Sequence, residues 1–168
     1  MTHRWADFHA EQPRFADAVR ERFARFRHHV LGTLRPDGAP RLTGLEADFR
    51  DGELWLGMMP GSRKALDLRR DPRFALHANP GPGAEMENGD VRVSGRAVEV
   101  TDEDTLARYL AGAPEDMPAR FQLFRAEFTE VVRVHIEGED LVCRVWHPGR
   151  PLRTIRRGAD DSPPREDE

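Results

Sequence analysis

The chain has 168 residues, of which 38% are hydrophobic and 33% are charged, so it can bury one core and is expected to form a single domain. It contains no run of about 18 apolar residues and no apolar N-terminal stretch, which excludes a membrane-spanning helix and a signal peptide. Its one cysteine excludes an intrachain disulfide. We therefore expect a soluble, cytoplasmic protein with no membrane contact.

The formal net charge of −4 comes from the C-terminal end of the chain. Residues 158–168 hold five acidic residues and one Arg, which leaves 25 basic and 25 acidic residues in 1–157. The end also lacks large apolar side chains, so we expect one domain over 1–157 and a disordered acidic tail over 158–168. A body with balanced charge argues against broad nucleic-acid binding.

The first elements are a helix and three strands. Residues 13–27 are expected to form the helix, because apolar side chains recur there at helical spacing: Phe15, Val19, Phe23 and Phe26. The hydrophobic period then changes to two. The turn sequences RPDG and RDG divide this stretch into three strands, over 28–34, 40–50 and 53–59.

A short helix and two further strands are expected next. Ser62 is suited to the N-cap of the helix, which ends before Asp71-Pro72. Strands are expected over 73–78 and 90–100. Between these strands, residues 79–88 are rich in Pro and Gly and predict a mobile loop that borders the pocket.

The last third of the chain completes the predicted sheet. Thr101 is expected to cap a helix that ends near Gly112, and a helical turn is expected over 117–124. A hairpin around the sequence EGED adds two strands. Six or seven mostly antiparallel strands with helices at their connections predict a closed β-barrel, so the fold class is mainly β (α+β).

The helix after Ser62 begins with two cations, Arg63 and Lys64, and Lys64 is the only lysine among 26 basic residues. The helix dipole disfavours cations at this end by about 0.3–1 kcal/mol each. A bound phosphate would reverse that balance, because charge-assisted hydrogen bonds contribute about 1.5–3 kcal/mol each. The two cations therefore indicate a phosphate site, with solvent-exposed side chains as the alternative.

Arg41 is a further candidate phosphate ligand. It alternates along its strand with Thr43 and Leu45, so a charged residue shares a face with apolar residues. The alternative is an arginine at the barrel rim that extends its charged end into water.

Three sequence segments together resemble the pyridoxamine 5'-phosphate oxidase-like superfamily of flavin and deazaflavin split β-barrels: PRLTG at 40–44, GSRKA at 61–65 and LRRDPRFAL at 68–76. The resemblance covers residues 23–100 well. It implies a six- to seven-stranded antiparallel Greek-key split β-barrel with flanking helices. It also implies a homodimer with two cofactors at the subunit interface.

The resemblance further implies which residues bind the cofactor. Its phosphate would be held by four residues: Arg41, Ser62, Arg63 and Lys64. Its ribityl chain and ring would lie along five others: Leu42, Thr43, Gly57, Met58 and Met59. Trp146 covers the ring from the partner subunit or, as the alternative, is a core residue.

The resemblance implies an oxidoreductase that uses FMN or the deazaflavin coenzyme F-420 on a small organic substrate. The segment VWHPGRPLRTIRRG differs from the basic, histidine-containing substrate motif of the true oxidase, so we do not expect pyridoxamine phosphate oxidation. Arg69 and Arg70 would suit the longer anionic tail of the deazaflavin. The histidines lack metal-ligand spacing, so no metal site is expected. No residue is nominated as a catalytic acid or base.

Two other functions are weighed against this one. The chain is alternatively a non-catalytic carrier of flavin, deazaflavin or haem, with His77 or His147 as an axial haem ligand. The basic stretch RKALDLRRDPR is alternatively a nucleic-acid contact, which is disfavoured because Asp67 and Asp71 interrupt it.

Overall fold

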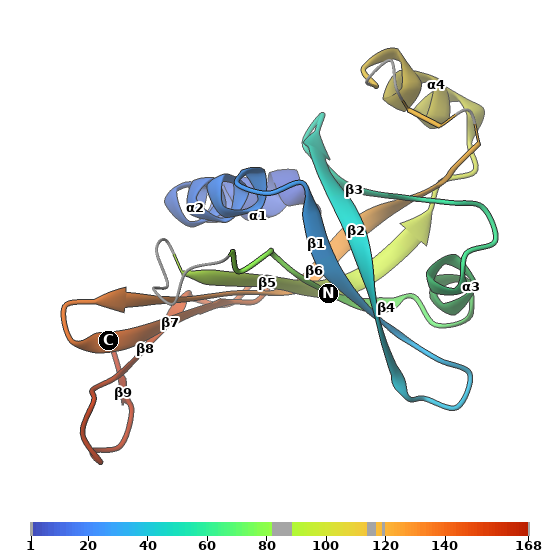
Figure 1. Cartoon of the computed structure of the whole chain (residues 1–168). Coiled ribbons are helices and arrows are strands. Elements are labelled where there is room, and N and C mark those ends of the chain that lie inside the picture. Colours follow the sequence, from blue (N-terminus) through green and yellow to red (C-terminus); the bar gives the residue numbers. More distant parts are fainter. Residues whose placement is uncertain (1, 82–88, 114–116, 119, 168) are drawn as a thin grey trace.

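The computed structural model describes residues 2–81, 89–113, 117–118 and 120–167 and is built around an antiparallel barrel (Figure 1). Six strands form the barrel: β1 (His28–Leu34), β2 (Pro40–Arg50), β3 (Glu53–Met58), β4 (Arg73–His77), β5 (Asp90–Glu99) and β6 (Gln122–Glu137). The strand order is β3-β2-β1-β4-β5-β6, and β3 also pairs with β6 to close the barrel. The chain passes from β3 to β4, beside β1, which is a Greek-key connection. The predicted fold class is confirmed.

The first three strands lie where the sequence predicted them. Their turns contain Gly38 and Gly52, with φ angles of 83° and 73°, a conformation that favours glycine. The β1–β2 register places His28 opposite Glu46 and Thr33 opposite Arg41. The first pair lies on the outward face of β2, which lines the site, and the second lies on the opposite face, where Thr33 is buried.

Four helices flank the barrel in the described chain: α1 (Trp5–Glu11), α2 (Pro13–Ala24), α3 (Arg63–Arg70) and α4 (Glu103–Ala111). Helix α2 is confirmed, although it ends at Ala24 and not at residue 27. Helix α1 was not predicted, because its two large apolar residues, Trp5 and Phe8, are too few to define a period. None of the described helices has the length and apolarity needed to cross a membrane.

Two details of the predicted elements near α4 are wrong. The N-cap of α4 is Asp102 and not Thr101, because the Asp102 carboxylate accepts the Thr105 N–H at 2.8 Å. The helical turn expected over 117–124 is replaced from Gln122 onward by β6, which pairs there with Met58 of β3. Residues 82–88 of the expected mobile loop lie outside the described residues.

The sheet continues beyond the barrel through β7 (Asp140–Trp146), β8 (Arg153–Arg157) and β9 (Arg165–Glu166). Figure 1 shows these strands reaching away from the barrel, on the side opposite α3 and α4. The β6–β7 hairpin was predicted, whereas β8 and β9 were not. The single domain over 1–157 and the disorder of the 158–168 tail in solution stay predictions, although Arg165–Glu166 pairs with β8 here.

The barrel interior and the two N-terminal helices share one hydrophobic core. Its largest fully buried side chains include Trp146, Phe8, Phe124 and Phe128. A second, smaller cluster packs α4 against the outer face of β3 and contains Trp55, Val100, Tyr109 and Leu123. This smaller cluster fixes α4 beside β2 and β3, and so forms one wall of the site.

Candidate functional site

A cleft of about 640 Å³ lies between β2, the end of β3 and the α4 region. Four alternate residues of β2 line it along one face of the strand: Gly44, Glu46, Asp48 and Arg50. Leu45 and Phe49, between them, belong to the core or pack against it, so the cleft runs along the face of β2 that points away from the core. The volume is within the range of small-molecule sites.

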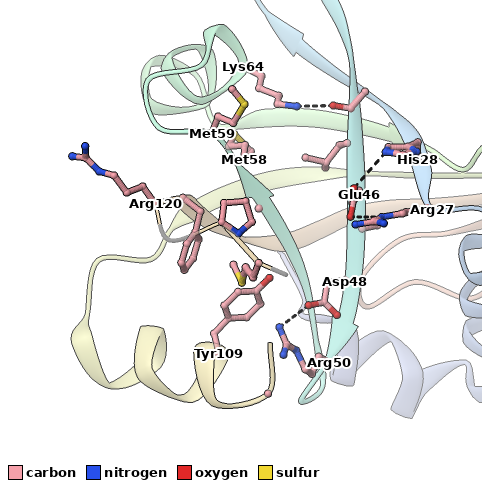
Figure 2. Close-up of a pocket in the computed structure, with 18 residues that line it drawn as sticks. Arg27, His28, Glu46, Asp48, Arg50, Met58, Met59, Lys64, Tyr109 and Arg120 are labelled. Atoms are coloured by element: carbon pink, nitrogen blue, oxygen red, sulfur yellow. Dashed lines mark hydrogen bonds and ion pairs between the residues drawn. The ribbon is translucent and has the colours of Figure 1, made fainter. Parts of the chain in front are cut away.

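The two cations at the start of α3 point in different directions. Ser62 caps the helix, as predicted, with its Oγ accepting the Ala65 N–H at 3.4 Å. Lys64 lines the cleft, and its Nζ donates to the Gly44 carbonyl at 2.5 Å (Figure 2). Partial burial lowers the pKa of Lys64 below its usual value. Arg63 is exposed, so of the two cations Lys64 is the one that faces a ligand in the cleft.

Arg41 is engaged by a buried carboxylate that the sequence analysis treated only as an interruption of a basic stretch. Its Nε donates to Asp67 Oδ2 at 2.6 Å, and the Thr33 hydroxyl donates to the same oxygen at 2.9 Å. Arg70 donates to Asp67 Oδ1 at 3.1 Å. Burial raises the pKa of Asp67, but these three donors outweigh it and the net pKa is lowered. Arg41 does not line the cleft, and its role toward a phosphate stays a prediction.

The structure separates the residues expected along the ribityl chain and ring. Gly57, Met58 and Met59 line the cleft. Leu42 follows the same face of β2 just beyond the cleft and is 72% exposed. Thr43 points to the other face, where its buried hydroxyl has no hydrogen-bond partner among the described residues.

Trp146 is a core residue. Its side chain is fully buried in this chain, and its Nε1 donates to Glu11 Oε2 at 2.9 Å. A side chain in this position presents no surface to a cofactor in a partner subunit. The structure therefore places Trp146 as the alternative prediction described it, as a residue of the core.

The far end of the cleft holds a pair of residues that the sequence analysis missed. The Arg50 guanidinium lies over the ring of Tyr109, with Cζ 4.3 Å from the ring centroid. Its Nη2 donates to Asp48 Oδ2 at 2.7 Å. Tyr109 is the only tyrosine in the chain, but its sequence distance from Arg50 gave no signal of contact.

Charged side chains also meet across the middle of the cleft. Glu46 contacts Arg27 Nε at 3.0 Å and His28 Nε2 at 3.4 Å (Figure 2). The histidines considered as haem ligands lie elsewhere: His77 Nδ1 is 2.6 Å from the Ala78 carbonyl and His147 Nδ1 is 3.0 Å from the Thr129 carbonyl. The described residues contain no group of three or more potential metal ligands.

Sequence comparison gives the family. The profile of the pyridoxamine 5'-phosphate oxidase family matches residues 15–138, which include all six barrel strands and the whole of α3. The chain belongs to the pyridoxamine 5'-phosphate oxidase-like family. The predicted family is therefore confirmed. No curated protein matches the chain.

Solved structures show how widely the family fold is used. An FMN binding protein related to pyridoxamine 5'-phosphate oxidase, from Nostoc punctiforme, is 15% identical with a TM-score of 0.59, over 88% of this chain and 96% of that one. PhzG from Burkholderia lata, solved with tetrahydrophenazine-1-carboxylic acid, is 16% identical with a TM-score of 0.51, over 96% and 90%.

A heme binding protein from Mycobacterium smegmatis also has this fold. It is 19% identical with a TM-score of 0.52, over 83% of this chain and 57% of that one. Identities this low show the fold alone. Proteins with this fold thus include one named for FMN binding and one named for haem binding, and the choice for this chain depends on its own cleft.

Proposed function

We propose that the chain is an oxidoreductase that uses FMN, or alternatively the deazaflavin coenzyme F-420, to transfer hydride or electrons to or from a small organic substrate. The observation that carries the proposal is the cleft, which joins a lysine at a helix N-terminus to an open, partly apolar wall. A Cβ at Gly44 would meet no atom within 4 Å, and one at Gly57 would meet only the Tyr109 hydroxyl, at 3.9 Å. The two glycines therefore leave room for a ligand against the strands.

The residues of this cleft fit a phosphate-bearing flavin. Lys64 and the N-terminal end of α3 supply positive charge for a phosphate. Met58, Met59 and Leu45 supply apolar surface that excludes water. The flavin supplies the hydride and electron chemistry when it is bound, so the chain's own task is to bind, orient and shield it.

The surroundings of α3 favour FMN over the deazaflavin. Arg69 makes a two-point contact with Glu99, at 2.8 and 2.7 Å. Arg70 contacts Asp67 and the Leu34 carbonyl. Both cations are therefore already paired, which removes the reason for expecting them to bind the longer anionic tail.

The same geometry makes haem the weaker candidate. Neither His77 nor His147 lines the cleft, and the histidine that does, His28, contacts Glu46. A carrier that binds flavin without catalysis is the remaining alternative. Such a carrier would bind flavin in the same cleft and would differ from the proposed enzyme only in having no turnover.

One experiment separates these functions. The purified chain is titrated with FMN, the deazaflavin and haemin, followed by flavin fluorescence and visible absorbance, and then assayed for oxidation of reduced nicotinamide and of reduced deazaflavin. Saturable FMN binding with turnover is the expected result. Binding without turnover would support the carrier, and saturable binding of haemin alone would overturn the flavin proposal.

We further propose a homodimer with the cofactor at the subunit interface. Exposed apolar side chains lie beside the cleft on β1, β2, the segment after β3, and α3: Val30, Leu42, Met59 and Leu66. Leu42 and Met59 are 72% and 71% exposed, and water contact with such a patch is unfavourable. A second subunit would cover it and complete the wall of the cleft.

Leu42→Glu is expected to shift the protein from dimer to monomer, because a charge would be buried at the interface. Sedimentation velocity at micromolar concentration measures this. Leu141→Glu, on β7 and 37% exposed, is the matched control and should leave the dimer intact. A wild-type monomer that still binds FMN would contradict the interface site.

A further inference from the structure

Arg50 has more hydrogen-bond donors than the described chain uses. Its Nη2 donates to Asp48, but its Nε and Nη1 are buried and have no partner among the described residues. Buried charged donors without an acceptor are costly. A guanidinium is also a planar fork of donors that matches the two oxygens of a carboxylate.

Arg50 lies at the opposite end of the cleft from Lys64. Lys64 contacts Gly44, and Arg50 follows Gly44 by six residues on the same face of β2. At about 3.3 Å per residue, the two ends are roughly 20 Å apart along the strand. A cofactor held by its phosphate at Lys64 therefore leaves the Arg50 end free for a second ligand.

The walls at this end suit a planar acid. The Tyr109 ring packs against the guanidinium, and its hydroxyl lies 3.9 Å from the position that a Cβ of Gly57 would occupy. Burial and the neighbouring Asp48 carboxylate raise the pKa of Tyr109, so the phenol stays protonated. Phe121 adds an aromatic surface. Cation, phenol and aromatic wall together match an aromatic ring that bears an anion.

We propose that Arg50 and Tyr109 form a subsite for the carboxylate of a planar organic substrate. Asp48 holds Nη2 and so fixes the plane of the guanidinium. The inference deepens the proposed function, since it assigns a substrate class to the same cleft. The competing explanation is that Arg50 only fastens α4 to β2.

Benzoate and its uncharged counterpart benzamide test the subsite on the unmodified protein. Calorimetry is expected to show benzoate binding about tenfold or more tightly than benzamide, because only benzoate pairs with the guanidinium. In NMR spectra, benzoate should shift the Arg50 Nε–H and Tyr109 ring signals. Equal affinity for the two ligands, or shifts confined to other residues, would overturn the proposal.

Two variants provide a second test of the subsite. Arg50→Gln is expected to lower benzoate affinity about tenfold or more and to leave FMN affinity within about twofold. Arg108→Gln, an exposed residue of α4, is the matched control and should change neither affinity. If Arg50→Gln does not fold, the wild-type comparison of benzoate with benzamide decides alone.

The FMN titration keeps the two proposals distinguishable. Benzoate binding at Arg50 without any FMN binding would contradict the proposed function and leave the subsite standing. FMN binding without discrimination between benzoate and benzamide would contradict the subsite and leave the proposed function standing.

Discussion

Lys64→Ala is expected to weaken FMN binding about ten- to a hundredfold. The change removes a charge-assisted hydrogen bond to phosphate, which contributes about 1.5–3 kcal/mol. Lys64 already lies in the cleft with its Nζ at the Gly44 carbonyl, so a phosphate at the start of α3 would be within its reach. Fluorescence titration of wild type and variant with FMN measures the effect.

Two measurements separate loss of the ligand contact from damage to the fold. Without cofactor, the variant loses the hydrogen bond to Gly44 but also removes a cation from the positive end of a helix dipole. The two effects oppose each other, so the free energy of unfolding should stay within about 1 kcal/mol of wild type. Arg63→Ala, at the exposed neighbouring position, should weaken FMN binding less than Lys64→Ala. Unchanged FMN affinity for Lys64→Ala would remove the phosphate site from this end of the cleft.

Local sequence signals predicted the barrel strands well. Strands β1, β2 and β3 are separated by short turns whose glycines have positive φ, so pattern and turn chemistry agree on each boundary. The start of α3 was also predictable, because Ser62 is a capping residue that follows Gly61 and directly precedes the helix. These features depend on residues that are close together in the sequence.

The parts that were missed depend on contacts between distant segments. Strand β8 has the sequence RTIRR, with three Arg residues and one large apolar residue, so it shows no hydrophobic pattern that would predict its pairing with β7. The contact of Arg50 with Tyr109 forms because the small cluster around Trp55 places α4 beside β2. Asp67 belongs to α3, and its sequence neighbours are basic. Its side chain is nevertheless buried against Arg41 and Thr33, two strand residues that precede it by 26 and 34 positions.

The buried carboxylate of Asp67 is expected to contribute the largest single polar term to stability near the site. Its side chain is 3% exposed and accepts hydrogen bonds from Thr33, Arg41 and Arg70. Asp67→Ala leaves the partly buried Arg41 guanidinium without its partner. Breaking a buried ion pair in this way costs about 3–5 kcal/mol, so chemical denaturation should show a loss of that size.

The pH dependence of stability tests the same carboxylate without a change in volume. The folded-state pKa of Asp67 is lowered, so its contribution to stability is fully present above the unfolded pKa and is lost as the pH falls through the folded value. Wild type should therefore lose stability below about pH 4, and Asp67→Asn should flatten that dependence. Asp161→Asn is the control, because Asp161 is exposed in the C-terminal segment, away from α3. Equal acid profiles for wild type and Asp67→Asn would show that the pairing of Arg41 with Asp67 does not stabilise the fold, and Arg41 would then be free to turn toward a phosphate.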